Sequence, residues 1–137
     1  MMPKATVKER IRSSVRASSS AVFLRGDFAR FGDYRQVSRA LSELQGAGDL
    51  VRVGYGVYAR ARPSTISGRP VPTESLVKIG LEVMKKLGID ADLGSDARAL
   101  RGGTSTQVPM LPVISVGNSR VSRRIGLGNR RVVYERG

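Results

Sequence analysis

Two stretches in the first half of the chain carry apolar side chains at helical spacing. One follows Thr6, which begins the Thr-x-x-Glu pattern of a capping box, and the other follows Asp33, with Gln36 in the equivalent third position. The apolar stripes are Val7, Ile11 and Val15 in the first stretch and Val37, Leu41 and Leu44 in the second. Gly46 and Gly48 can end the second helix because glycine adopts the left-handed conformation at no steric cost. The pattern therefore predicts two amphipathic helices.

A strand-like pattern lies between and after these helices. Residues 21–24 are a short apolar run that either pairs as a strand or simply enters the core, and residues 27–31 predict a short helix. Residues 50–53 and 57–59 flank Gly54-Tyr55-Gly56, a hairpin signal because both glycines permit a positive φ. Val51, Val53, Val57 and Ala59 alternate toward one side, and Arg52, Tyr58 and Arg60 toward the other. The order of helix, apolar run, short helix, helix and hairpin predicts a winged helix-turn-helix.

The second half has a different composition. Residues 63–72 are rich in proline and serine and predict an extended linker between a winged helix-turn-helix domain at 1–62 and a smaller domain at 73–137. Thr73 is placed to cap the next helix, and residues 96–100 fit a second, short one. The first of these two helices has its apolar face at Leu76, Ile79, Val83, Met84 and Leu87, and its end at Lys85-Lys86 and Gly88.

From Gln107 onward the pattern changes to strands. Segments 113–116, 121–127 and 131–134 are separated by the turn signals Gly117-Asn118 and Gly128-Asn129. They predict a three-stranded antiparallel sheet against one helix. The predicted fold class is therefore α+β, with an N-terminal winged helix-turn-helix followed by a small C-terminal domain of helix and antiparallel sheet.

Charge adds information about partners. The chain has 24 Lys and Arg against 11 Asp and Glu, a net charge of +13, which indicates a polyanionic partner. A coding bias toward arginine can explain part of the arginine count but not the net charge. Residues 1–62 carry 12 basic against 5 acidic side chains, and residues 63–137 carry 12 against 6, so charge alone does not assign binding to either half.

Several classes of function are disfavoured by what the chain lacks. It has no Cys and no His, which excludes disulfides, zinc–thiolate sites and Cys or His catalysis, so we expect neither an enzyme nor a cofactor. Asp90, Asp92 and Asp96 are close in sequence but lack the pattern of a calcium loop, and no metal site is expected. No apolar run approaches a membrane span and the N-terminus lacks a secretory core, so we expect a cytoplasmic protein without membrane contact.

The predicted helix after Asp33 is the best candidate for reading DNA. Its polar face and the hairpin supply the candidate contacts Arg35, Ser38, Arg39, Ser42, Arg52, Tyr55 and Arg60. On the helix alone, an ordinary solvated face is the better explanation. The hairpin and the charge together favour contact with the major groove and its phosphates. Tyr55 could stack on or bond to a nucleotide, or could simply be an exposed aromatic at the tip, and the sequence does not separate these alternatives.

A second basic cluster lies around the two C-terminal turns. It consists of Arg120, Arg123, Arg124, Arg130 and Arg131. These side chains either protect the edge of the sheet as solvated charges or bind RNA or an acidic patch on a protein partner. The sequence leaves these alternatives open.

Two segments resemble a known family. The stretch VFLRGDFARFGDYRQVSRALSELQGAGDLVRVGYGVYAR is similar to the N-terminal winged helix of AbiEi-type antitoxins, and PTESLVKIGLEVMKKLGI, GTSTQVP and SRVSRRIGLGNRRVVYE are similar to the short C-terminal domain of the same group. The resemblance implies a phage-defence (abortive infection) antitoxin that represses its own operon by binding inverted repeats in double-stranded DNA, for which a homodimer is suited. It further implies that residues 73–137 counteract a nucleotidyltransferase-like toxin. This chain is shorter than the longer members of the group, which leaves a stand-alone regulator as another possibility.

The main alternative is a different kind of protein. A basic inhibitor encoded by a phage or plasmid would bind an acidic or nucleic-acid-binding site on another protein, and this complex would not require DNA. An RNA-binding protein ranks third, because three Phe, four Tyr and no Trp give few stacking platforms.

Overall fold

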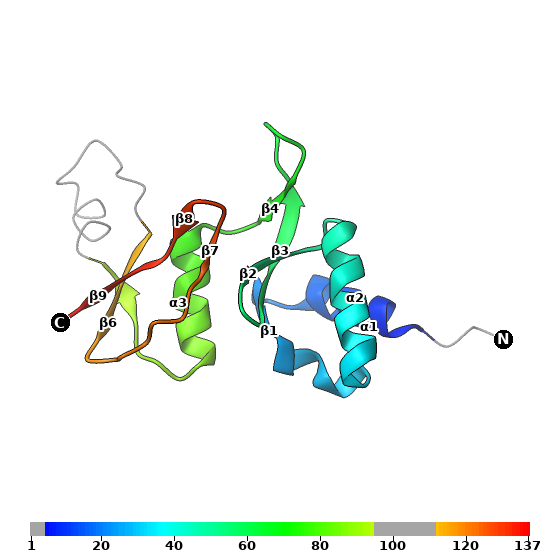
Figure 1. The fold of residues 1–137 in the computed structure, drawn as a ribbon, viewed down its shortest axis with the longest axis horizontal. Helices are drawn as coiled ribbons and strands as arrows, with labels where there is room; N and C mark the ends of the chain where they lie inside the picture. The colour runs from blue at the N-terminus through cyan, green and yellow to red at the C-terminus, as the bar shows by residue number, and fades with distance from the viewer. Residues whose placement is uncertain (1–4, 95–111) are drawn as a thin grey trace. The chain divides into compact units, whose positions relative to one another are not determined.

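The computed structural model describes residues 5–94 and 112–137, which form two compact units that meet in sequence at Glu74 and Ser75 (Figure 1). Both units combine helices with sheets, so the predicted α+β class is confirmed. The short helix predicted at 96–100 lies outside the described residues. Within the described ranges no helix has the length and apolarity needed to cross a bilayer.

Helices of the first unit begin where the local sequence signals place them. They are α1 (Val7–Ala17), the 3-10 helix η1 (Arg25–Phe31) and α2 (Tyr34–Gly46). Thr6 Oγ1 accepts a hydrogen bond from the backbone N–H of Glu9 at 3.1 Å, and Asp33 Oδ1 accepts one from Gln36 at 2.8 Å. Both predicted capping boxes are confirmed. Their residues are only three positions apart, so a local sequence pattern was enough to predict them.

Three antiparallel strands pack against these helices in the order β1-β3-β2. They are β1 (Val22–Leu24), β2 (Leu50–Gly54) and β3 (Val57–Pro63). The apolar run at 21–24 therefore contributes a strand to the sheet. Tyr58 of β3 pairs with Phe23 of β1, and its side chain is part of the core that contains Ile11, Phe28 and Leu41. The sheet face that carries Tyr58 and Arg60 consequently faces the helices and not solvent.

The segment 63–72, predicted to be a linker, is part of a second hairpin. Strand β4 (Pro70–Pro72) pairs with Ala61–Pro63 of β3, and the tip closes with a hydrogen bond of 2.8 Å from Ser64 N to Arg69 O. Proline cannot donate to a central ladder but is tolerated on an edge strand, which is where β4 lies. The linker prediction was wrong, because edge strands tolerate the proline composition that also marks linkers.

The second unit has a helix, α3 (Leu76–Lys86), which buries Ile79, Val83 and Met84. Its cap is Ser75, whose Oγ accepts a hydrogen bond from Lys78 N at 3.3 Å. The expected cap at Thr73 is therefore wrong by two residues. The predicted stop is confirmed by the positive φ of 75° at Gly88.

The predicted three-stranded antiparallel C-terminal sheet is wrong. Strands β5 (Asp92–Leu93), β6 (Val113–Gly117) and β9 (Val133–Arg136) form the order β5-β6-β9, with β6 and β9 parallel. A separate small hairpin joins β7 (Gly126–Leu127) to β8 (Arg130–Arg131). The turns at Gly117 and Gly128 do form, with φ of 58° and 60°. The segment between β6 and β9 is long enough for the crossover that parallel pairing requires.

Candidate nucleic-acid interface

One side of α2 is exposed to solvent. Val37, Leu41 and Leu44 pack into the core, and the opposite side of the helix carries exposed side chains. The exposed side chains at the centre of that outer face are Arg35, Arg39 and Ser42. Among the described residues, neither Arg35 nor Arg39 has a hydrogen-bond or ion-pair partner. Two guanidinium groups one helical turn apart are thus available to bind an anion.

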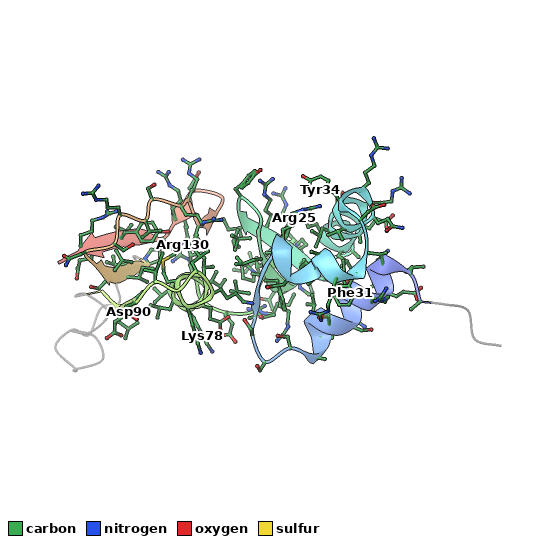
Figure 2. The ribbon with its side chains drawn as sticks, turned by 90° about the horizontal axis from the view of Figure 1, so that it is seen from below. Arg25, Phe31, Tyr34, Lys78, Asp90 and Arg130 are labelled. Atoms are coloured by element: carbon green, nitrogen blue, oxygen red, sulfur yellow. The ribbon has the colours of Figure 1, made fainter. Side chains whose placement is uncertain are left out.

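Ser38 lies at the edge of this face and is half-buried. Its Oγ accepts a hydrogen bond of 2.8 Å from Nη2 of Arg25, which also donates to Tyr34 O at 2.9 Å. The Arg25 guanidinium stacks 4.0 Å from the centre of the Tyr34 ring, and Figure 2 shows the two side chains together at the start of α2. Ser38 therefore helps to hold Arg25 in place.

Arg25 also reaches the β2–β3 turn. Its backbone N–H donates to Gly56 O at 2.9 Å, so one residue bonds to the first turns of α2 through its side chain and to the hairpin through its main chain. The sequence interpretation missed Arg25. The available signal was a basic residue directly after a predicted strand, which by itself is not distinctive.

The β2–β3 turn presents an aromatic and an arginine together. Tyr55 is 83% exposed, and the Arg52 guanidinium lies 5.9 Å from the centre of its ring. Arg52 Nε donates to Gly54 O at 3.2 Å, which keeps the side chain at the tip. Gly56 has a φ of 66°, whereas Gly54 does not need a positive φ. The turn therefore offers one ring and one guanidinium beside the start of α2.

Arg60, the last predicted contact of the hairpin, has its Nη2 directed into the fold. That nitrogen donates to Val15 O at 2.9 Å, Ser20 O at 3.1 Å and Ser18 O, which are carbonyl groups at the end of α1 and just after it. The side chain caps α1, where its charge also complements the negative end of the helix dipole. The donors of Arg60 Nη2 are therefore used within the fold.

Acidic side chains in residues 1–62 are used within the fold. Asp49 pairs with Arg12 at 3.1 Å and Arg16 at 3.2 Å, and Glu43 pairs with Lys8 at 3.9 Å. The other three acids serve capping and turn bonds: Glu9, Asp27 and Asp33. The arginines that pair with acids lie on α1, and no ion pair within the described residues involves Arg35 or Arg39.

Comparison with known proteins gives one assignment. A family profile matches residues 6–137, which includes both compact units. The chain belongs to DUF6088, a family of unknown function. No curated protein and no solved structure is significantly similar to it.

The predicted C-terminal arginine cluster lies in the second unit of this DUF6088 protein. All five side chains are exposed: Arg120, Arg123, Arg124, Arg130 and Arg131. Two side chains of β9 donate hydrogen bonds to the backbone of residues 119–123. Tyr134 Oη donates to Arg123 O, and Arg136 donates to Ser119 O at 3.1 Å and to Val121 O. The part of the cluster from Arg120 to Arg124 therefore lies on a backbone segment held by side-chain bonds.

Ionisation of Tyr134 is expected to loosen this support. Burial raises the pKa of Tyr134 above its ordinary value of 10.0, and Arg123 and Arg136 partly offset the rise. The folded state favours the neutral form of Tyr134. Its contribution to the free energy of unfolding is therefore complete below pH 10 and is lost as pH rises through the raised pKa. Comparing urea unfolding of wild type and Tyr134→Phe from pH 8 to 11 should show a steeper loss of stability in wild type. Parallel curves would contradict the expectation.

Proposed function

We propose that the first unit is a winged helix that binds double-stranded DNA, and that this DUF6088 protein is a transcriptional repressor of the antitoxin type. The observation that carries the proposal is the outer face of α2, where Arg35 and Arg39 have no partner within the described residues. Arg25 links that helix to the turn that presents Tyr55. A reading helix and an adjacent wing are the two parts that such a domain brings to DNA.

In this proposal α2 enters the major groove. The groove is about 12 Å wide and accepts one α-helix with its side chains. Arg35, near the start of α2, is in the part of a recognition helix that contacts base edges, and Arg39 and Ser42 follow along the same face. Tyr55 and Arg52 at the turn contact the neighbouring sugar–phosphate backbone. Arg25 is a positioning residue, because its side-chain bonds fix the start of α2 relative to the wing.

The antitoxin part of the proposal draws on the resemblance to AbiEi-type proteins. Repression would use inverted repeats at the protein's own promoter, bound by a pair of chains. The C-terminal arginine cluster is the surface proposed to bind the partner toxin, which would be a nucleotidyltransferase-like protein. A gene for such an enzyme beside the gene for this chain would support this part independently of DNA binding.

Selection of binding sites from a random-sequence duplex pool tests DNA binding directly. We expect one sequence to be enriched, and its affinity should fall steeply with salt. With about 5–8 phosphate contacts, log K should fall by about 4.5–7 for each tenfold rise in salt concentration. No enrichment together with a weak salt dependence would contradict the proposal.

A second candidate function is inhibition of another protein. The observation in its favour is the exposed arginine cluster of the second unit, part of which lies on a segment held by Tyr134 and Arg136. Purification from the native host after nuclease treatment separates the two functions. A stable protein partner that survives the nuclease and is not a nucleotidyltransferase-like toxin would favour the inhibitor, because a DNA-binding repressor loses its DNA-mediated partners and keeps only a toxin.

A further inference from the structure

The second hairpin of the first unit ends in an exposed apolar side chain. The hairpin consists of the end of β3, the tip at 64–69 and β4, and it projects beyond the rest of its unit (Figure 1). Ile66 at the tip is 96% exposed, more than any other large hydrophobic side chain among the described residues. A fully exposed isoleucine on a projecting tip gains free energy when a partner buries it.

Hydrogen bonds hold this tip in one shape. Ser64 Oγ accepts from the backbone N–H of Ile66 at 3.2 Å and of Ser67 at 3.3 Å, and Ser67 Oγ accepts from Arg69 N at 3.3 Å. Gly68 N donates to Ser64 O at 2.9 Å, with a φ of 73° that favours glycine. A tip held in this way loses little conformational entropy on binding.

The charges around Ile66 select the kind of partner. Arg62 and Arg69 flank the tip and are exposed, and no Asp or Glu occurs from Leu50 to Thr73. Pro70 and Pro72 remove two amide donors from β4, which makes this edge a poor template for another strand. A basic ribbon that resists strand addition fits a polyanion better than a protein edge or a second copy of the chain.

The two hairpins lie toward opposite ends of α2. The β2–β3 turn is joined to the start of α2 through Arg25, whereas a Cβ atom on Gly48, just after the end of α2, would lie 3.7 Å from Cγ of Pro70. Strand β3, which connects the two hairpin tips, has seven residues and rises about 23 Å. The major groove is about 12 Å wide, so both tips can pass outside the groove that receives α2.

We propose that the β3–β4 hairpin is a second DNA-contacting arm, which inserts Ile66 between base steps in the minor groove while Arg62 and Arg69 contact the flanking phosphates. The proposal rests on the DNA binding proposed above. Apolar wedges of this kind partly unstack a base step and kink the duplex by about 20–90°. The arm therefore adds bending of the target DNA to sequence reading by α2.

Directed cleavage locates the arm on DNA. The chain has no cysteine, so a single Thr65→Cys substitution accepts an iron–EDTA cleavage reagent beside an intact Ile66. Tyr55→Cys reports on the first hairpin, and Ser13→Cys on the exposed side of α1 is the control. On the duplex enriched by wild-type protein, we expect cuts from positions 65 and 55 at separate places and none from position 13.

The possible outcomes separate the two proposals. Cuts from position 55 without cuts from position 65 would overturn the arm and leave DNA binding by α2 intact. Failure of wild-type protein to enrich any duplex, together with a weak salt dependence of binding, would overturn both.

Substitution of Ile66 tests the wedge itself. Ile66→Ser should reduce the bend measured by energy transfer between the duplex ends and lower affinity by roughly 3- to 10-fold, since burial of isoleucine is partly offset by unstacking. Ile66→Leu should retain both properties. An unchanged bend in Ile66→Ser, with an unchanged melting temperature, would overturn the wedge.

Discussion

Replacing Arg35 and Arg39 together by alanine is expected to lower the affinity for the selected duplex by about 100-fold. Each good base contact contributes about 1–3 kcal/mol, and each phosphate contact contributes about 0.9 to the salt slope. If both side chains bind phosphates, the slope should fall by nearly two while sequence preference stays. If they bind bases, the salt slope should be unchanged and the preference for the selected sequence should weaken. Titrations at several salt concentrations, with matched and mismatched duplexes, distinguish these cases.

The matched control removes the same charge from another part of the unit. Arg10 and Arg30 are exposed and stack on Phe31, with guanidinium carbons 5.1 Å and 4.4 Å from the ring centre. The double substitution of these two by alanine should change affinity only a few-fold, because it alters long-range attraction alone. Equal losses in the two double variants would mean that net charge, and not the α2 face, accounts for binding.

Elements of the first unit could be predicted because their signals are local. Asp33 and Gln36 are three residues apart, and the buried positions Val37, Leu41 and Leu44 follow directly from helical periodicity. The same signals leave Arg35 and Arg39 on the outer face. This part of the candidate site therefore needed no information from distant residues.

Errors arose where pairing between distant segments decides the structure. The composition of 63–72 is compatible with a linker and with an edge strand, and only pairing with β3 selects the strand. The Gly117-Asn118 turn indicates a reversal of the chain but does not specify its partner, and β6 pairs with the more distant β9. Alternation along the hairpin correctly grouped Tyr58 with Arg60, yet it could not indicate which face the helices would cover.

Contacts of single long side chains were also beyond prediction from the sequence. Arg25 and Arg60 act on residues 9 to 45 positions away, so no short motif marks them. In the sequence, neither arginine is distinguishable from the others, and only the fold places carbonyl groups beside them. The side-chain donors of Arg25 and Arg60 are used by the protein itself, whereas Arg35 and Arg39 have no partner within the described residues.

Arg60→Ala is expected to destabilise the first unit by about 3 kcal/mol. Hydrogen bonds to charged groups contribute about 1.5–3 kcal/mol, and the bonds from Arg60 Nη2 serve carbonyl groups at and after the end of α1, among them those of Val15 and Ser20. The loss should appear as a lower midpoint in urea unfolding. For a unit of this size it should lower the melting temperature by roughly 10–25 °C.

Arg62 provides the control for this substitution within the same strand. It lies two residues beyond Arg60 and is exposed, and within the described residues its side chain donates only to Pro63 O, at 3.4 Å. Arg62→Ala should therefore change stability by less than about 0.5 kcal/mol, as surface substitutions usually do. Equal destabilisation by the two variants would contradict a capping role for Arg60. A stable Arg60→Ala variant with weakened DNA binding would instead return Arg60 to the interface, since its charge would then act outside the fold.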